Sequence, residues 1–218
     1  MADIFREVDE EVRQDRALAL WKKYQNVIIT AAALIVLAAG GWRFWQAQQL
    51  KAAYVADEKL QAAMALSREG KAQEAEAEFV ALAKDAPAGY AAIARLRAAG
   101  ELTAKDRKGA VAAFDAIAAD AGFDPLFRDA ARLRAGMIRV DDADMKEIEQ
   151  RLSPLAAAGQ PFRSSARELL ALAALKFGDL EVAGRWLDQI VTDSESPGAM
   201  KQRAEAFLGL VRSDRKPK

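Results

Sequence analysis

The sequence contains no cysteine and no histidine. Without cysteine, the chain can form no disulfide, no thiolate metal site, no lipid attachment through a thiol and no cysteine nucleophile. Without histidine, it lacks the commonest general base, the commonest metal ligand and every catalytic triad that depends on imidazole. Catalysis would have to rest on carboxylates or lysines alone, so we expect the chain not to be an enzyme.

Motifs for carboxylate or phosphate chemistry are missing as well. Asp141, Asp142 and Asp144 begin like a calcium-binding loop, but the turn glycine and the closing glutamate of that pattern are absent. Gly70 and Lys71 lack the other residues of a phosphate-binding loop, and no glycine-rich dinucleotide motif occurs. Basic and acidic residues, 32 of each, are interspersed, which leaves no basic patch for nucleic acid. We predict no cofactor, no metal and no nucleic-acid partner.

Charge is absent from one long stretch, residues 27–42, which reads VIITAAALIVLAAGGW. Counted with its aromatic shoulders, from Tyr24 to Trp45, it is about 22 residues long, enough to cross a hydrocarbon core of roughly 30 Å. Aromatic side chains suited to headgroup depth and basic side chains that can reach outward stand at both ends. The sequence therefore predicts a transmembrane helix over residues 25–45. Its predicted membrane anchors are Trp21, Tyr24, Trp42, Arg43 and Trp45.

Two alternatives to a transmembrane helix have to be weighed. A buried core helix of a soluble domain rarely carries aromatic and basic residues at both ends. A cleavable signal peptide has a short basic region before its apolar part, whereas a long segment with several acidic residues precedes this run. The small residues Ala38, Ala39 and Gly40 lie inside the run, so they make no convincing cleavage site. An uncleaved anchor fits the sequence best.

The basic residues near the run set its predicted orientation. More lysine and arginine precede the run than follow it within a comparable distance: Arg6, Arg13, Arg16, Lys22 and Lys23 against Arg43, Lys51 and Lys59. This bias predicts a cytoplasmic N-terminus and places most of the chain on the other side of the membrane. In the cytoplasmic arm, residues 1–24, apolar residues at helical spacing indicate an amphipathic helix, while a solvated and partly frayed helix remains the alternative.

Behind the run the chain shows helical patterns and no strand signals. Glycine and proline divide these patterns at Gly70, Pro87, Gly100, Gly122 with Pro125, Gly159 with Pro161, Gly178, and Pro197 with Gly198. We predict helices over residues 46–68, 71–84, 88–99, 105–119, 124–139, 144–157, 162–177, 180–191 and 199–212.

The predicted helices form pairs that repeat. Ala75 and Phe79, Ala110 and Phe114, Ile148 and Leu152, and Ala183 and Leu187 each place a bulky apolar residue four positions after a small or aliphatic one, at intervals of 35, 38 and 35 residues. Small residues recur at the same intervals on the first helix of each pair, at Ala63, Ala98, Gly136 and Ala171, where the partner helix could approach closely. A two-helix unit with a period near 34 is typical of tetratricopeptide repeats, although the motif's tryptophan and tyrosine are missing here.

The pattern therefore predicts an all-α fold: an N-terminal transmembrane helix followed by a tetratricopeptide-like solenoid of antiparallel helix pairs. We place the solenoid domain at residues 46–212, with residues 199–212 as its capping helix. Residues 213–218 are polar, and we predict a disordered tail there.

The acidic arm, the single span ending in Gly40-Gly41-Trp42-Arg43-Phe44-Trp45 and the helix pairs together resemble a known family across essentially the whole chain. That family is the single-span ancillary subunit of the bacterial Sec translocon. The resemblance implies an inner-membrane protein with a cytoplasmic N-terminus and a periplasmic tetratricopeptide-like domain. It implies as partners the translocon subunits and a membrane-anchored periplasmic chaperone of the prolyl-isomerase class.

We therefore expect a non-enzymatic adaptor that assists secretory or membrane protein biogenesis, with a scaffold for an envelope or cell-division complex as the alternative. The first helices of stacked pairs line the concave side of such an array. Their shared register predicts a protein-binding groove at Arg95, Leu102, Leu133, Met137, Val140, Leu172 and Leu175. Packing against the neighbouring repeat is an open alternative for Leu133 and Leu172.

Overall fold

A computed structural model describes residues 2–214, with side chains for residues 18, 21–27 and 29–213. Within this range the regular structure is helical, without strands. The elements are α1 (Ala2–Arg68), α2 (Ala72–Asp85), α3 (Ala88–Glu101), the 3-10 turn η1 (Leu102–Ala104), α4 (Arg107–Ala119), α5 (Pro125–Arg139), α6 (Met145–Ala156), α7 (Arg163–Lys176), α8 (Leu180–Thr192) and α9 (Gly198–Asp214). The chain separates into two compact units, Met1–Ala52 and Ala53–Lys218. The domain boundary predicted between residues 45 and 46 falls inside the first unit.

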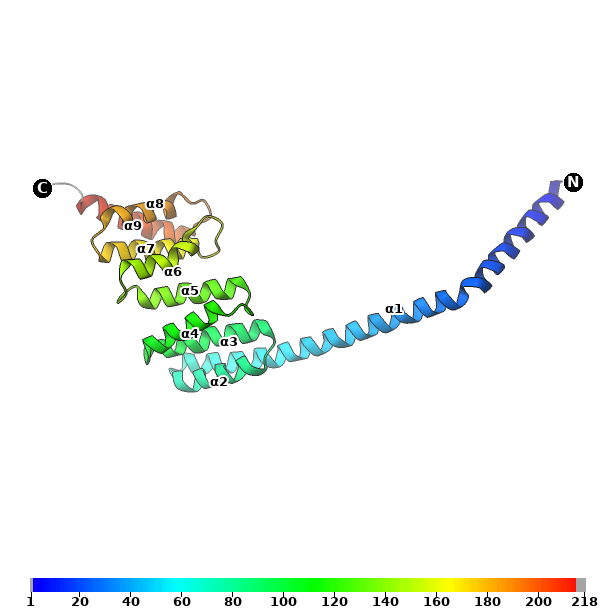
Figure 1. The fold of residues 1–218 in the computed structure, drawn as a ribbon, viewed down its shortest axis with the longest axis horizontal. Helices are drawn as coiled ribbons and strands as arrows, with labels where there is room; N and C mark the ends of the chain where they lie inside the picture. The colour runs from blue at the N-terminus through cyan, green and yellow to red at the C-terminus, as the bar shows by residue number, and fades with distance from the viewer. Residues whose placement is uncertain (1, 215–218) are drawn as a thin grey trace. The chain divides into compact units, whose positions relative to one another are not determined.

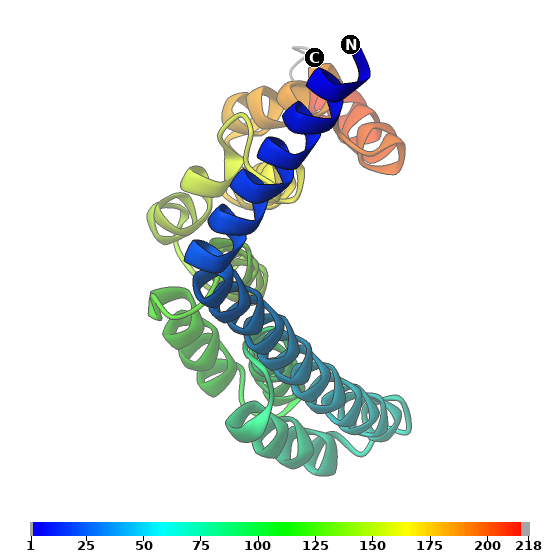
Figure 2. The ribbon, with the colours of Figure 1, turned by 90° about the vertical axis from the view of Figure 1, so that its right-hand side faces the viewer.

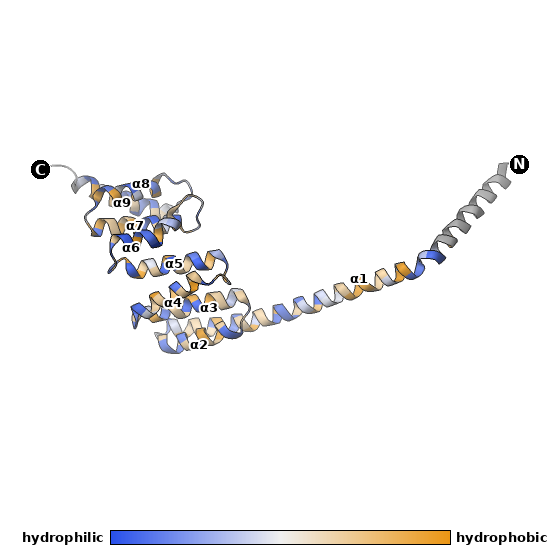
Figure 3. Cartoon of the chain, in the orientation of Figure 1, coloured by the Kyte–Doolittle hydropathy of each residue, from blue (hydrophilic) through white to orange (hydrophobic). Residues whose placement is uncertain are grey.

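The first unit contains the apolar run of α1, visible in Figure 3 as the stretch of the helix richest in hydrophobic residues. By length and composition, α1 is long and apolar enough to cross a membrane, and none of its most apolar window is buried. The described side chains from Val27 to Trp42 are all exposed. This exposure does not fit the alternative of a buried core helix, whose apolar side chains would be covered by other elements. The side chains of the predicted amphipathic arm lie almost entirely outside the described residues.

In the second unit, successive helices stack in chain order from α2 to α9 (Figures 1 and 2). For α2 to α9, the predicted helix bounds agree with the observed ones to within two residues at each end. Three predicted breaks, at Gly70, Gly159 and Gly178, have positive φ angles of 77–80°, a conformation that glycine adopts without steric cost.

The helix end predicted at Gly100 lies one residue too early. The α3 helix continues through Gly100 to Glu101 and then tightens into η1. An isolated glycine lowers helix stability by only about 1 kcal/mol, so tertiary packing can stabilise a helix that continues through it. At the C-terminus, α9 extends to Asp214, two residues into the segment predicted to be a disordered tail. The remainder of that tail, residues 215–218, lies outside the described residues.

The core of the second unit consists of four small clusters rather than one large one. In order, they join α1 with α2 and α3, then α3 with α4 and α5, then α5 with α6 and α7, and finally α7 with α8 and α9. All eight paired register residues, from Ala75 and Phe79 to Ala183 and Leu187, are at most 2% exposed. The predicted repeat register is therefore confirmed as the register of the core.

The small first-helix residues also lie where close packing needs them. Ala63, Ala98 and Ala171 are buried. At Gly136 a Cβ atom would come within 2.6 Å of the Leu152 Cδ2 atom on α6. Contact between neighbouring helices thus depends on small side chains at one recurring position, which is the packing of a helix-pair solenoid.

Candidate functional site

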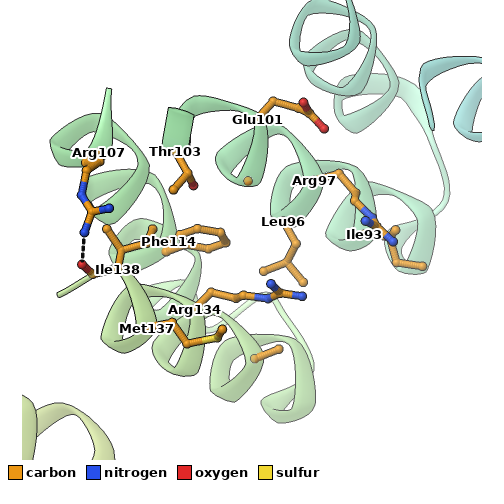
Figure 4. A pocket seen from close by; sticks show the side chains of 12 residues that line it. Ile93, Leu96, Arg97, Glu101, Thr103, Arg107, Phe114, Arg134, Met137 and Ile138 are labelled. Carbon is orange, nitrogen blue, oxygen red and sulfur yellow. Dashed lines mark hydrogen bonds between the residues drawn. The ribbon is translucent and has the colours of Figure 1, made fainter. Parts of the chain in front are cut away.

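A pocket of about 640 Å³ lies between α3 and α5 (Figure 4). These are the first helices of two consecutive pairs, and η1 and the α4 helix complete the walls. The lining residues are Ile93, Leu96, Arg97, Gly100, Glu101, Thr103, Arg107, Phe114, Ala130, Arg134, Met137 and Ile138. The volume is in the range of about 300–1,000 Å³ that is usual for ligand pockets.

The inner wall of the pocket is apolar because a core cluster reaches the surface here. Phe114, the bulky register residue of α4, is 2% exposed and packs with Ile138 and Leu96. In Figure 4 the Phe114 ring points toward Leu96. Met137, which is 45% exposed, adds a flexible apolar side chain at the entrance.

The polar side chains of the lining differ in whether they already have partners. Arg107 Nη2 donates a hydrogen bond to the Ile138 carbonyl oxygen over 2.7 Å and lies 3.5 Å from an Asp141 carboxylate oxygen. Glu101 accepts a hydrogen bond of 2.6 Å from the Ser67 hydroxyl. Arg97 and Arg134 are exposed, and neither has an ion pair, hydrogen bond or ring contact within the described part of the chain. The pocket therefore combines an apolar inner wall with two guanidinium groups that have no partner in the described part of the chain.

The structure does not gather the residues predicted for the groove into this pocket. Only Met137 lines it. Arg95 instead forms an ion pair with Asp120, with 3.3 Å between Arg95 Nη1 and Asp120 Oδ2, and its guanidinium carbon lies 5.0 Å from the centre of the Phe123 ring. Leu133 is 8% exposed and belongs to the core cluster of α5, α6 and α7, so the open alternative of core packing, and not the groove position, describes this residue. The other four predicted residues, Leu102, Val140, Leu172 and Leu175, are half-buried. Three of them, Leu102, Val140 and Leu175, pack on core clusters.

A single register could not have located this pocket. The pocket is bounded by the side of α3 that faces α5 and by the side of α5 that faces α3, and these sides carry different repeat positions. One residue along a helix corresponds to about 100° of rotation, so Leu133 is buried while its neighbour Arg134 lines the pocket. The usable signal was the cluster of arginines near apolar residues on two consecutive first helices.

Shifted pKa values outside the pocket mark ion pairs that join helices. Glu147 on α6 accepts hydrogen bonds from Arg139 on α5 and from Arg151 on its own helix, and Arg139 chiefly lowers the Glu147 pKa to about 2. Arg163, helped by the backbone N–H of Glu195, holds the pKa of Asp193 well below its usual range. Neither arrangement pairs a nucleophile with a base, and no group of side chains suited to a metal ion occurs among the described residues.

The side chains predicted as membrane anchors are all exposed. Trp21, Tyr24, Trp42 and Trp45 are each 45–63% exposed, and Arg43 is also exposed. The Trp42 and Trp45 rings lie 5.4 Å apart between centroids, and the Lys23 ammonium lies 5.2 Å from the centre of the Tyr24 ring. Rings with an apolar body and a polar edge, accompanied by cations, are suited to a membrane–water interface.

Helix pairs with a repeating core, preceded by one long apolar helix, define a tetratricopeptide-like protein. Residues 19–185 match the tetratricopeptide repeat-like domain family, and the chain belongs to that family. The match includes the apolar run as well as the helices from α2 to the start of α8. Neither a curated protein nor a solved structure matches the chain. Membership indicates a protein-interaction domain, since helix-pair repeats present extended binding surfaces and typically carry no catalytic site.

Proposed function

We propose that this chain is a non-enzymatic adaptor, anchored by one span in the bacterial inner membrane. The tetratricopeptide-like domain lies in the periplasm, and residues 1–24 form the cytoplasmic arm. The observation that carries the proposal is the exposed apolar run of α1, flanked by exposed aromatic anchors and belonging to the same family match as the repeats. A run of this length costs least in a bilayer.

The partners are the subunits of the Sec translocon and a membrane-anchored periplasmic chaperone of the prolyl-isomerase class. Support for them comes from the resemblance of the arm, the Gly-Trp-Arg-Phe-Trp exit from the span and the repeats to the translocon's ancillary subunit. A solenoid of helix pairs suits such a role, because it can hold one partner along its surface while the span restricts it to the plane of the membrane.

Affinity purification after crosslinking in intact membranes tests this function. With the full chain as bait in mild detergent, translocon subunits and a periplasmic isomerase-like chaperone should be enriched. Two chimeras serve as controls: one replaces residues 27–42 by an unrelated span, and the other keeps residues 1–52 and replaces the repeat domain. The chaperone should co-purify only with chains that keep the repeat domain. Recovery of neither partner contradicts the proposal, and enrichment of division or envelope proteins with the full chain replaces it by a scaffold function.

A further inference from the structure

We infer that the pocket between α3 and α5 binds an acidic protein segment, whose apolar side chain enters the cavity while its carboxylates pair with Arg97 and Arg134. The inference rests on the proposed adaptor function, because it specifies the chemistry of a protein partner.

Three other exposed arginines of the same domain already have carboxylate partners. Arg95, Arg107 and Arg203 have side chains that are 49–52% exposed, and each lies within 4 Å of a carboxylate. Arg97 and Arg134 are also exposed, yet they have no such partner in the described chain. The pocket lining holds three arginines and one glutamate, and of these arginines only Arg107 has a carboxylate partner, Asp141. The charge of the lining is therefore positive on balance.

The positive side chains stand beside an apolar wall rather than on an open polar surface. Figure 4 shows Arg134 reaching the end of the pocket where Leu96 lies, and Arg97 beside Ile93. Next to such a wall the effective dielectric constant is lower than in bulk water, so a carboxylate gains more from an arginine here than on an open helix face. Phe114 and Met137 meanwhile offer contact to an aliphatic or aromatic side chain.

These two features select among possible occupants. An inorganic anion would use the arginines but gain nothing from the apolar floor. A basic or neutral segment would leave both guanidinium groups unpaired. A fatty acid combines a carboxylate with an apolar chain, but it has one charge for arginines that come from two different helices. A peptide with carboxylates on both sides of an apolar residue matches both arginines and the floor.

Fluorescence anisotropy with the detergent-solubilised full chain tests the inference. The probe is a short fluorescein-labelled peptide in which glutamates flank leucines, and its comparison peptides carry lysine for glutamate or serine for leucine. The variant is the double substitution Arg97→Gln and Arg134→Gln. The matched control is Arg68→Gln with Arg185→Gln, which removes the same charge from exposed arginines outside the pocket. Circular dichroism confirms that both variants are folded.

We expect the acidic-apolar peptide to bind, the two comparison peptides to bind at least tenfold more weakly, and raised salt to weaken binding. The pocket variant should weaken binding about tenfold, as expected when charge-assisted hydrogen bonds are lost, and the control should change it little. Equal losses in both variants, equal binding of the lysine peptide, or displacement of the peptide by oleate at equal concentration would overturn the inference.

The two proposals can fail separately. Translocon subunits that co-purify with a chain showing no preference for acidic peptides would contradict only the pocket inference. Peptide binding that depends on Arg97 and Arg134, in a chain that recovers no translocon subunit, would contradict only the translocon assignment.

Discussion

Gly136 shows how much of the packing depends on single side chains. It lies on α5 facing α6, and a Cβ atom there would stand 2.6 Å from Leu152 Cδ2 and 3.1 Å from Leu152 Cγ. Leu152 is fully buried, so its side chain has little room to move away. Two effects therefore oppose each other when alanine replaces this glycine. Helix propensity favours alanine by about 1 kcal/mol, while overpacking of a core costs about 1–3 kcal/mol.

We predict that Gly136→Ala lowers the free energy of unfolding by about 1 kcal/mol, because the steric term exceeds the propensity term. Gly209→Ala is the matched control: Gly209 is exposed on α9, and a Cβ there meets nothing within 4 Å. That control should gain up to about 1 kcal/mol. Urea denaturation measures both. If Gly136→Ala stabilises the chain as much as Gly209→Ala does, the close approach of α5 and α6 is wrong.

Leu133 and Met137 lie one helical turn apart on α5. Leu133 belongs to the core, whereas Met137 lines the pocket. Leu133 is 8% exposed and Met137 is 45% exposed. Leu133→Glu should therefore lower the unfolding free energy by about 3 kcal/mol or more, because it buries a carboxylate and removes core contacts. Met137→Glu should shift the melting temperature by only a few degrees. Thermal melts followed by circular dichroism check both, and a steep loss in Met137→Glu would show that Met137 is a core residue.

Glu147 predicts a measurable pH dependence. Its pKa falls from an ordinary value of 4.5 to about 2, chiefly through its hydrogen bonds with Arg139, with a further contribution from Arg151. A carboxyl group whose pKa is lower in the folded state adds stability above the unfolded value, and this contribution disappears as the pH falls toward the folded value. Stability should therefore fall between about pH 4.5 and pH 2.

The variant Glu147→Gln should remove part of that fall and be less stable than the parent chain at neutral pH. Urea midpoints measured across this pH range provide the comparison. Glu149→Gln, on the same helix but exposed, is the control. An unchanged acid profile in Glu147→Gln would mean that its ion pairs with Arg139 and Arg151 do not persist in solution.

Among the elements, the second helix of three of the four pairs begins with the same aspartate cap. Asp106, Asp144 and Asp179 each accept a hydrogen bond from a backbone N–H in the first turn, of Gly109, Glu147 and Val182 respectively. The same repeat position is Lys71 in the first pair, and α2 has no side-chain cap. The backbone at Lys71 (φ −84°, ψ 59°) is close to that at Asp179 (φ −83°, ψ 78°), so a capping side chain fits there.

We predict that Lys71→Ser stabilises the chain by about 1 kcal/mol, the usual contribution of an N-cap, while Lys71→Ala gives no such gain. Loss of the exposed Lys71–Glu69 ion pair should matter little. The converse change, Asp179→Ala, should cost about 1 kcal/mol. Denaturation curves for these three variants decide the matter, and a Lys71→Ser variant no more stable than Lys71→Ala would contradict the assignment of the cap.

The sequence was sufficient to predict helices and their pairing, because glycine, proline and the apolar period act locally. Gly70 and Gly178 end helices through their own backbone freedom, and Phe79, Phe114, Leu152 and Leu187 recur at the repeat interval. The pocket was beyond such reasoning. Whether Arg95 or Arg97 lacks a partner depends on where Asp120 and Phe123 lie, and only the folded arrangement fixes that. Local patterns give elements, whereas a site between elements depends on tertiary distances.

At the scale of the whole molecule, two units are suited to different surroundings. The described apolar side chains of the unit up to Ala52 are exposed, whereas the unit from Ala53 contains four buried apolar clusters. The family match, residues 19–185, includes both kinds of segment. A bilayer around the apolar run and water around the repeats would satisfy both units, which is the basis of the adaptor proposal.

The most direct test of this account is the position of the two chain ends relative to the membrane. Alkaline phosphatase is active only outside the cytoplasm, so it reports the side on which a fusion point lies. Fused after Lys218 it should be active, and fused to a fragment that ends before Trp21 it should be inactive, because the excess of basic residues before the run keeps the N-terminus inside. The reverse pattern, or an inactive fusion after Lys218, would contradict a periplasmic tetratricopeptide-like domain anchored by α1.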